Sequence, residues 1–229
     1  MIRVGIAGGA GYTAGELIRI LANHSAIELR YIQSESHKGE AISSVHGDLL
    51  YLPISFSDID FSDIDVLFLC LGHGNSAKFL AENTVPESVK IIDLSNDFRL
   101  KDSEDDHDFV YGLPEYNRKP MVRGAKHVAN PGCFATAIQL ALLPLAKNHL
   151  IKSDIHVTAI TGSTGAGVKP SATSHFSWRN DNVSIYKPFR HQHLGEIKQT
   201  MRELQPDFDA EINFVPVRGC FSRGIMAIV

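Results

Sequence analysis

The first hundred residues alternate between strand-like apolar segments and amphipathic segments of helical period, and this alternation restricts the possible fold more than any other feature. Strand patterns occur at residues 2–8, 27–34, 65–72 and 89–95. Helical patterns lie between them, at residues 13–24 and 75–83. Apolar strands separated by helices are typical of a parallel sheet that is buried on both faces. We therefore expect an α/β fold with a doubly wound sheet.

The pattern changes after a helix that starts near Cys133. A strand enters a Gly-rich loop at residues 154–167, and a polar, aromatic stretch leads to a helix at 194–205 and a strand at 210–217. We expect a first domain at residues 1–132 and a second, α+β domain at 133–229. The final "RGIMAIV" has the pattern of a strand interior, which predicts a sheet that lacks partner strands.

Composition excludes several classes of function. A formal net charge of −4 gives no basic footprint, so we expect no nucleic-acid partner. The longest apolar runs are too short to span a bilayer, and the N-terminus enters a strand pattern with no signal peptide. Three cysteines do not form a disulfide framework, which favours a reducing cytoplasm. No Cys/His pairs have zinc-finger spacing, so no structural metal is expected.

The first strand leads into a loop of small residues at the start of a helix. Gly8, Gly11 and Ala14 have G-x-x-G-x-x-A spacing, and Tyr12 and Thr13 lie at the helix start. Small residues permit a tight turn and allow a pyrophosphate to approach the helix N-terminus, where the dipole favours an anion. The alternative is a tight strand–helix turn without a ligand. We expect a dinucleotide site that includes these residues.

The end of the second strand carries hydroxyl and basic side chains. NAD-binding folds place an acidic residue here to bind the ribose 2′-hydroxyl, whereas NADP needs hydroxyls and cations. Ser34, Ser36 and Lys38 suit a 2′-phosphate, and Glu35 does not unless it points away. The alternative is a solvated polar loop. We expect NADP (NADPH) as the cofactor.

Cys133 follows a Pro-Gly turn directly ahead of a long apolar helical segment, "NPGCFATAIQLALLPLAK". This position predicts a thiol at a helix N-terminus, where amides and the dipole stabilise a thiolate. Cys133 is therefore a candidate nucleophile, and the alternative is a small core residue. For Cys70, inside "LFLCLG", a structural role is favoured, and for Cys220 it is the more frequent case.

Two histidines, His191 and His193, lie where a helix is expected to begin. Histidine is the usual acid/base partner of a nucleophilic cysteine. Metal binding by this pair lacks obvious further ligands, and surface histidines generally have no catalytic role. Arg99 follows another strand and is a candidate for binding a phosphate or carboxylate, the alternative being a surface ion pair. The Gly-rich loop at 162–167, which contains Gly165, is a further candidate for approach to cofactor or substrate.

Taken together, these segments resemble the N-acetyl-γ-glutamyl-phosphate reductase family over essentially the whole chain. The matching segments, in the family's order, are "GGAGYTAGEL", "DLSNDFRL", "YGLPE", "NPGCFATAIQLALLP", "STGAG" and "HQHLGEI". The Cys133 segment is the most specific. The resemblance implies a Rossmann NADP domain and a second domain like that of glyceraldehyde-3-phosphate dehydrogenase. We expect this second domain to be incomplete, because the match lacks the family's C-terminal part.

The resemblance also implies a mechanism. The Cys133 thiolate attacks the acyl phosphate, phosphate leaves, and the thioester is reduced to N-acetylglutamate 5-semialdehyde in arginine biosynthesis. The proton is handled by His193 or His191, with His193 preferred. Arg99 and Asn130 are implied as substrate-binding residues, and a homo-oligomer, dimer or tetramer, is implied as the assembly.

The related aspartate-semialdehyde dehydrogenases carry a histidine after a "VPV"-like strand, whereas "VPVRGCFSRG" has Cys220 there and no histidine. This difference argues against an aspartyl substrate. Ala14 for a glycine and Thr164 for a serine are conservative departures from the family, and Glu35 weakens the NADP preference. An N-succinyl or aminoadipyl substrate would use the same chemistry, and a catalytically silent NADP-binding fragment is the other alternative.

Overall fold

The computed structural model describes residues 1–101 and 108–229, and the chain divides into two compact units, Met1–Asn130 and Pro131–Val229. The division falls after residue 130, whereas the sequence led us to expect it after 132. Gly132 is the N-cap of the first helix of the second unit, so the two residues before Cys133 belong with that helix.

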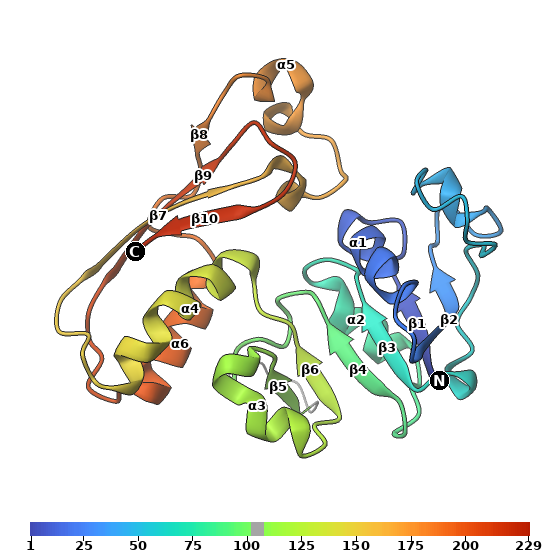
Figure 1. The fold of residues 1–229 in the computed structure, drawn as a ribbon, viewed down its shortest axis with the longest axis horizontal. Helices are drawn as coiled ribbons and strands as arrows, with labels where there is room; N and C mark the ends of the chain where they lie inside the picture. The colour runs from blue at the N-terminus through green and yellow to red at the C-terminus, as the bar shows by residue number, and fades with distance from the viewer. Residues whose placement is uncertain (102–107) are drawn as a thin grey trace. The chain divides into compact units, whose positions relative to one another are not determined.

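The first unit contains a six-stranded sheet in the order β2-β1-β3-β4-β6-β5, and all its strand pairs are parallel (Figure 1). Its strands are β1 (Ile2–Ala7), β2 (Ile27–Gln33), β3 (Val66–Leu69), β4 (Lys90–Asp93), β5 (Phe109–Tyr111) and β6 (His127–Ala129). Its helices are α1 (Tyr12–Leu21), α2 (Asn75–Glu82) and α3 (Pro114–Val122). The chain passes from β1 to β2 on one side and then returns to β3 on the other. The switch point, where open α/β sheets bind ligands, therefore lies at the end of β1.

Two separate hydrophobic clusters flank this sheet. One contains Ile18 of α1 packed with Ile6 and Ile32 of the sheet. The other contains Leu67 and Leu69, with Phe79 and Leu80 of α2 against it. Helices thus bury both faces, and the doubly wound α/β fold expected from the sequence is confirmed.

Three elements of the first unit were not anticipated: β5, α3 and β6. The two strands have three residues each, too few for an apolar pattern to show. Helix α3 has no buried residue, contains Pro120, and departs from helical backbone angles at Asn117. A helix without a buried face leaves no periodic signal in the sequence.

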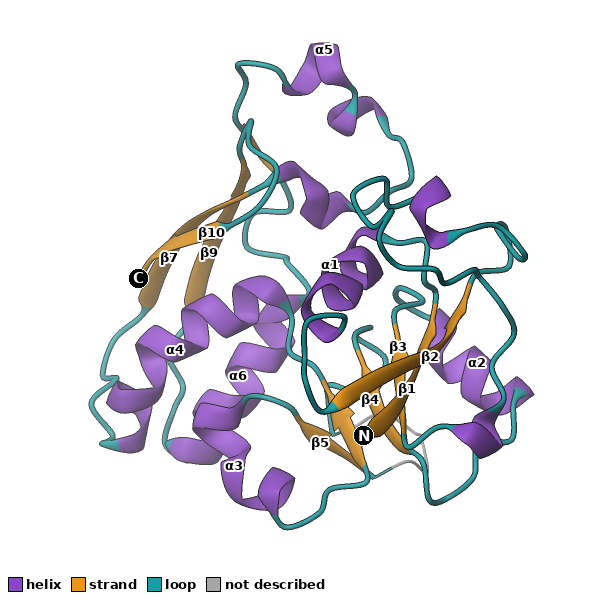
Figure 2. Ribbon diagram, turned by 45° about the vertical axis from the view of Figure 1, so that its right-hand side comes forward, coloured by secondary structure: helices purple, strands orange, loops and turns teal. Residues whose placement is uncertain are grey.

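The second unit packs two long helices on one face of a four-stranded sheet in the order β10-β7-β9-β8. The strands are β7 (Ile155–Thr161), β8 (Ser184–Ile185), β9 (Ile212–Arg218) and β10 (Ile225–Ile228). The helices are α4 (Cys133–Lys147), α5 (Phe176–Arg179) and α6 (His193–Leu204). Figures 1 and 2 show α4 and α6 side by side, and both contribute to a single core with β7 and β9.

Strand β10 confirms the strand pattern of the final residues, and it lies at the edge of this sheet. It pairs antiparallel with β7, and its other edge has no strand partner in the described part of the chain. Ile225 and Ala227 pack against the core, whereas Met226 and Ile228 are exposed. The face of the sheet opposite α4 and α6 is therefore partly apolar and open to solvent.

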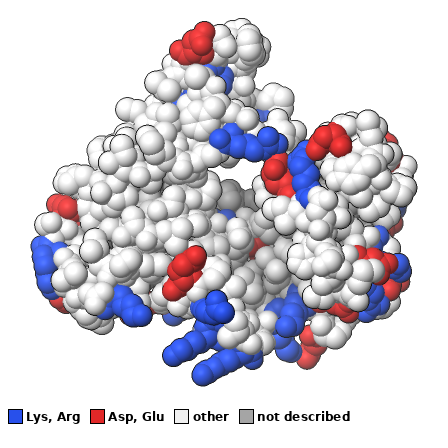
Figure 3. Space-filling view, viewed as in Figure 1, with Lys and Arg blue, Asp and Glu red and all other residues white. Residues whose placement is uncertain are grey.

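Charged side chains of both signs are scattered over the face shown in Figure 3, between larger uncharged areas. Exposed Arg118, Lys119, Arg123 and Lys126 lie on α3 and in the turn after it, and Figure 3 shows basic side chains gathered along the lower edge of this face. Among the described residues, none of the helices has the length and apolar character needed to cross a membrane.

Candidate active site

Cys133 is the first residue of α4, as its Pro-Gly context predicts. Gly132 is the N-cap in an extended conformation, and its carbonyl oxygen accepts the amide of Thr136 at 2.8 Å. The thiol is exposed, whereas its neighbours Gly132 and Phe134 are buried. The N-cap residue Gly132 has no side chain to cap the helix, and the first turn of the helix contains no acidic residue. The helix dipole therefore acts on the thiol and favours its thiolate form.

The imidazole of His193 lies against Gly132, the residue before Cys133. A β-carbon at position 132 would lie 2.4 Å from Nε2 of His193, so the ring occupies the space where any other residue would place its side chain. Three residues further along α6, Oε2 of Glu196 accepts the amide of Gly132 at 2.9 Å. His193 and Glu196 are 5% and 3% exposed. Two side chains of one helical turn therefore fix the backbone that precedes Cys133.

His191 lies next to His193 but has a different environment. The rings are 4.5 Å apart between centroids, and the backbone amide of His193 donates to Nδ1 of His191 at 3.2 Å. Burial and, to a smaller extent, the charge of Lys187 lower the pKa of His191 to about 4. His191 is therefore neutral near pH 7, with Nδ1 engaged as an acceptor, and it is a weak base.

The depressed pKa of His191 predicts a pH-dependent stability. The unfolded chain takes up a proton near pH 6.5 and the folded chain only near 4, so this contribution to stability is complete above pH 6.5 and declines as pH falls toward 4. The loss is about 2 kcal/mol at pH 5. We expect His191→Gln to lose less thermal stability than the wild type between pH 7.5 and pH 5, measured by circular dichroism.

The control for this experiment is His156→Gln, which makes the same change at an exposed position of β7. It should retain the wild-type dependence of the melting temperature on pH. An unaltered dependence in His191→Gln would show that His191 titrates normally in the folded protein.

Tyr186 and Arg218 lie on the same side of the site. The Tyr186 ring is 5.8 Å from that of His191, and the Arg218 guanidinium lies over the Tyr186 ring at 4.6 Å. Burial raises the pKa of the Tyr186 phenol, with Arg218 opposing and Cys133 adding to the shift. The Arg218 guanidinium and the Cys133 thiol are therefore both close enough to Tyr186 to influence the pKa of its phenol.

The other two cysteines differ from Cys133. Burial raises the pKa of Cys70 to about 12, with a smaller contribution from Asp93, so this thiol stays protonated. Its packing against the first hydrophobic cluster agrees with a structural role. Cys220 is exposed in the turn between β9 and β10 and does not begin a helix. Only Cys133 combines exposure with a helix start.

The loop after β1 has the features that a dinucleotide needs. Gly8 has φ +82, and a β-carbon there would lie 2.5 Å from the carbonyl oxygen of Cys70, so glycine is required. Gly11 is the N-cap of α1, which has no side-chain cap and no acidic residue in its first turn. Tyr12 and Thr13 follow as the first helical residues. Nothing in this first turn repels a phosphate at the α1 N-terminus, and the predicted residues fit the cofactor.

His46 is a buried residue that sequence reasoning did not single out. Its Nε2 donates to the carbonyl oxygen of Gly9 at 2.8 Å, within the loop. The contact connects a segment 37 residues away to the backbone between Gly8 and Gly11. His46 therefore holds the loop in the conformation that leaves the α1 amides accessible.

We expect His46→Ala to weaken NADPH binding about 3- to 10-fold, the value of one buried hydrogen bond. His46→Gln, whose amide can donate to the same oxygen, should recover part of the affinity. Fluorescence titration with NADPH measures the change, and His24→Ala at an exposed position is the matched control. Equal affinity in His46→Ala and wild type would contradict a positioning role.

The residues predicted to bind the 2′-phosphate follow β2. Strand β2 pairs with β1, so these residues lie next to the loop at residues 8–11 that follows β1. The amide of Gly9 donates to the carbonyl oxygen of Gln33 at 2.7 Å, which joins the two segments. Ser34 is buried with its hydroxyl 3.4 Å from that of Ser36. Lys38 is exposed and forms an ion pair with Asp58. The hydroxyls fit a phosphate, while the charge of Lys38 is shared with Asp58.

The remaining predicted residues lie elsewhere. Arg99 is buried and donates to the carbonyl oxygens of Asn130 at 2.8 Å and Leu94 at 3.0 Å, so it links the ends of β4 and β6 within the first unit. Gly165 belongs to the second unit, in a 3₁₀ turn at Ser163–Ala166. Substrate contact by Arg99 and Asn130, and cofactor contact by Gly165, remain predictions.

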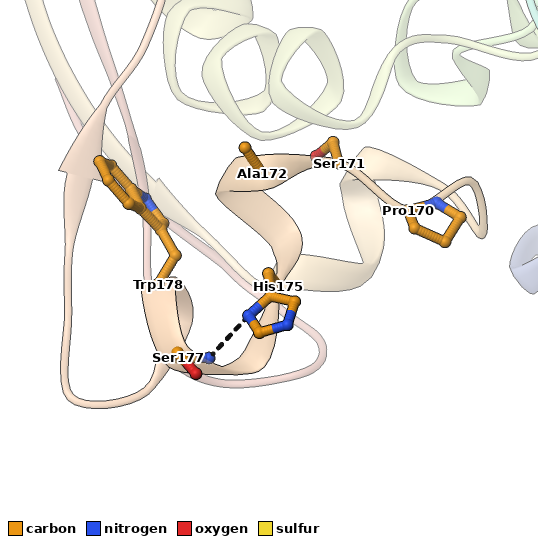
Figure 4. A pocket seen from close by; sticks show the side chains of 6 residues that line it. All are labelled: Pro170, Ser171, Ala172, His175, Ser177 and Trp178. Atoms are coloured by element: carbon orange, nitrogen blue, oxygen red, sulfur yellow. Dashed lines mark hydrogen bonds between the residues drawn. The ribbon is translucent and has the colours of Figure 1, made fainter.

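A surface hollow of about 650 Å³ lies in the polar, aromatic segment before α6 (Figure 4). It is lined by Pro170, Ser171, Ala172, His175, Ser177 and Trp178. In Figure 4, Nδ1 of His175 accepts the amide of Ser177, at 3.2 Å. None of the predicted catalytic side chains lines this hollow. Among the described residues, no group of three or more His, Cys, Asp or Glu side chains could hold a metal ion.

Four residues near these sites escaped sequence reasoning: Glu196, Tyr186, Arg218 and His46. Glu196 had a usable signal, because its i+3 spacing from His193 places both on one helix face. The contacts of His46 with Gly9 and of Arg218 with Tyr186 join segments that are distant in the sequence.

Comparisons with known proteins agree across the chain. Residues 3–123 match the family described as "Semialdehyde dehydrogenase, NAD binding domain", and residues 133–229 match "Semialdehyde dehydrogenase, dimerisation domain". The protein named N-acetyl-gamma-glutamyl-phosphate reductase from Parabacteroides distasonis is 60% identical over 233 residues. Its namesake from Bacteroides thetaiotaomicron is 59% identical over 233 residues. Each alignment covers 99% of this chain and 70% of the relative.

Solved structures of aspartate semialdehyde dehydrogenases share the fold. The enzyme II from Vibrio cholerae has a TM-score of 0.70 at 17% identity, covering 99% of this chain and 73% of the other. The structure with NADP from Candida albicans has a TM-score of 0.66 at 16% identity, covering 99% and 70%.

Proposed function

We propose, from the premise that the chain belongs to the N-acetyl-γ-glutamyl-phosphate reductase family, that it reduces N-acetyl-γ-glutamyl phosphate to N-acetylglutamate 5-semialdehyde. The reaction is a reductive dephosphorylation in arginine biosynthesis that consumes NADPH. One observation carries the proposal: an exposed cysteine starts a helix, and a histidine is packed against the glycine before it.

Cys133 is the nucleophile in this proposal. Its thiolate attacks the acyl carbon, a C–S bond forms, the bond from carbon to the phosphate oxygen breaks, and inorganic phosphate leaves. The product is a thioester on Cys133. The start of α4 favours the thiolate because the helix dipole acts there and the first turn contains no carboxylate.

His193 handles the proton. After reduction, collapse of a thiohemiacetal on Cys133 releases the aldehyde as the histidine takes the hydroxyl proton, which regenerates the thiolate. The geometry favours His193 over His191, because His193 lies against Gly132 whereas His191 has a depressed pKa and an engaged Nδ1.

NADPH supplies a hydride when it is bound. In the proposal, its pyrophosphate binds at the α1 N-terminus, at Gly8, Gly11, Tyr12 and Thr13. The 2′-phosphate receives hydrogen bonds from the hydroxyls of the buried Ser34 and the nearby Ser36. Lys38 contributes charge when it is not paired with Asp58.

The proposal includes a homo-oligomer, because residues 133–229 match a dimerisation domain. The partly apolar open face of the second sheet, with exposed Met226 and Ile228, is compatible with a dimer or tetramer. We assign the reaction to the cytoplasm, where the three cysteines, which form no disulfide in the described structure, stay reduced.

The reverse reaction tests the proposed function directly. Purified protein is incubated with N-acetylglutamate 5-semialdehyde, inorganic phosphate and NADP, and NADPH formation is followed by absorbance. We expect turnover that requires phosphate and that is faster with NADP than with NAD. A protein that binds NADPH but shows no phosphate-dependent turnover would be a silent cofactor-binding protein instead.

A further inference from the structure

Arg218 ends β9 on the strand face that points toward α4 and α6. Ile212, Phe214 and Pro216 are buried on this face, and the alternation of a strand places Arg218 next in the same row. Phe214 contacts Phe134, the residue after Cys133, with ring centroids 5.1 Å apart. The guanidinium therefore extends the row of side chains that supports the start of α4.

The ring of Tyr186 connects Arg218 to the histidines. The Arg218 guanidinium carbon lies 4.6 Å from the Tyr186 ring centroid, and that ring lies 5.8 Å from His191. Stacking fixes the plane of the guanidinium and leaves its edge for hydrogen bonds. The pKa of Tyr186, raised by burial and influenced by both Arg218 and Cys133, supports this proximity.

The positive charge at this position has no acidic partner. A second arginine, Arg179, is buried and donates to neutral oxygens only: the carbonyls of Asn182 and Arg218 and the hydroxyl of Ser184. The Nε atoms of both arginines are buried without a hydrogen-bond partner, and no carboxylate of the described residues pairs with either side chain. Arg179 is buried and Arg218 is partly buried. Cations withdrawn from water without an anion are costly, so this arrangement favours binding of an anionic ligand.

We propose that Arg218 binds a carboxylate of the substrate and thereby determines specificity for the acyl-amino acid. The inference rests on the proposed function, whose substrate carries an α-carboxylate, and a second carboxylate if the acyl group is succinyl. The planar guanidinium matches a carboxylate with two parallel hydrogen bonds, a geometry that lysine cannot provide.

Steady-state kinetics in the reverse direction test the proposal, with Arg218→Met, Arg218→Lys and wild type. The substrates are N-acetylglutamate and N-succinylglutamate semialdehydes, each varied at saturating phosphate and NADP. We expect Arg218→Met to raise the KM of the semialdehyde about 10- to 100-fold, the loss of a charge-assisted pair. Arg218→Lys should recover only part of the affinity. The KM for phosphate and the Kd for NADPH should not change.

Two further variants serve as a control for loss of charge and as a second test of the Arg218 position. Arg202→Met removes the same charge from an exposed position near the C-terminal end of α6 and should behave as wild type. Tyr186→Leu removes the stacking surface but keeps the charge, and it should raise the semialdehyde KM in the same direction. It tests the proposal even where Arg218→Met fails to fold.

The outcomes separate the possible ligands. An equal rise for both semialdehydes supports the α-carboxylate, and a rise for the succinylated one alone supports the terminal carboxylate. A rise in the KM of phosphate alone, or unchanged kinetics in active Arg218→Met, would overturn the inference while leaving the proposed function in place. An inactive wild-type protein would overturn the proposed function, and this inference with it.

Discussion

Cys133→Ser is expected to lower phosphate-dependent turnover at least about 10³-fold while NADPH binding stays unchanged. Serine retains the size and the helix start but not the accessible anion, because a hydroxyl at this position does not ionise near neutral pH. NADPH formation from the semialdehyde measures the first quantity, and fluorescence titration with NADPH measures the second.

The matched control is Cys220→Ser, which makes the same change at an exposed thiol outside the site. It should retain wild-type turnover. Reactivity toward iodoacetamide provides an independent readout, because the thiolate of Cys133 should be alkylated faster than Cys220 and far faster than buried Cys70. Substantial turnover by Cys133→Ser would rule out the thioester mechanism.

Gly132→Ala is expected to lower kcat at least about 10²-fold, because a single methyl group displaces the proposed base. Its β-carbon would lie 2.4 Å from Nε2 and 2.6 Å from Cδ2 of His193, so the imidazole must move from its place against residue 132. The backbone at position 132 has an ordinary φ of −63, so alanine is not strained there. The defect should therefore come from the displaced imidazole and appear in kcat, and any fall in the melting temperature would reflect repacking of this buried ring.

Gly47→Ala is the control for this substitution, because a β-carbon at that position meets nothing within 4 Å. It should match the wild type in kcat and in melting temperature. Wild-type kcat in Gly132→Ala would mean that the position of the His193 ring does not limit the reaction, and the role of the base would then have to be assigned elsewhere.

The sequence predicted most of the first unit because its strands and helices have strong local patterns. It also placed Cys133 and His193 at helix starts, since Pro-Gly turns and polar-to-amphipathic transitions are local signals. The contacts that organise the site are not local. Glu196 and Gly132 are 64 residues apart, and a hydrogen bond over such a separation leaves no periodicity in the chain.

Arg99 is a second residue whose hydrogen-bond partners its sequence position does not reveal. Its place after a strand indicated a ligand-binding cation, and it does lie at the end of that strand. The structure shows a buried guanidinium with two donors on backbone carbonyls. A sequence pattern can locate a side chain near the end of a parallel sheet, but packing decides which partners its hydrogen bonds reach.

The two contacts on Gly132 also restrict changes in chain length. His193 and Glu196 contact the same residue because they are one helical turn apart on α6. One inserted residue between them would rotate the carboxylate by about 100° around the helix axis and carry it away from the glycine amide. Insertions in the loop before His191 would leave this spacing intact. Insertions and deletions should therefore be tolerated in that loop, whereas the number of residues in the first turn of α6 should be fixed.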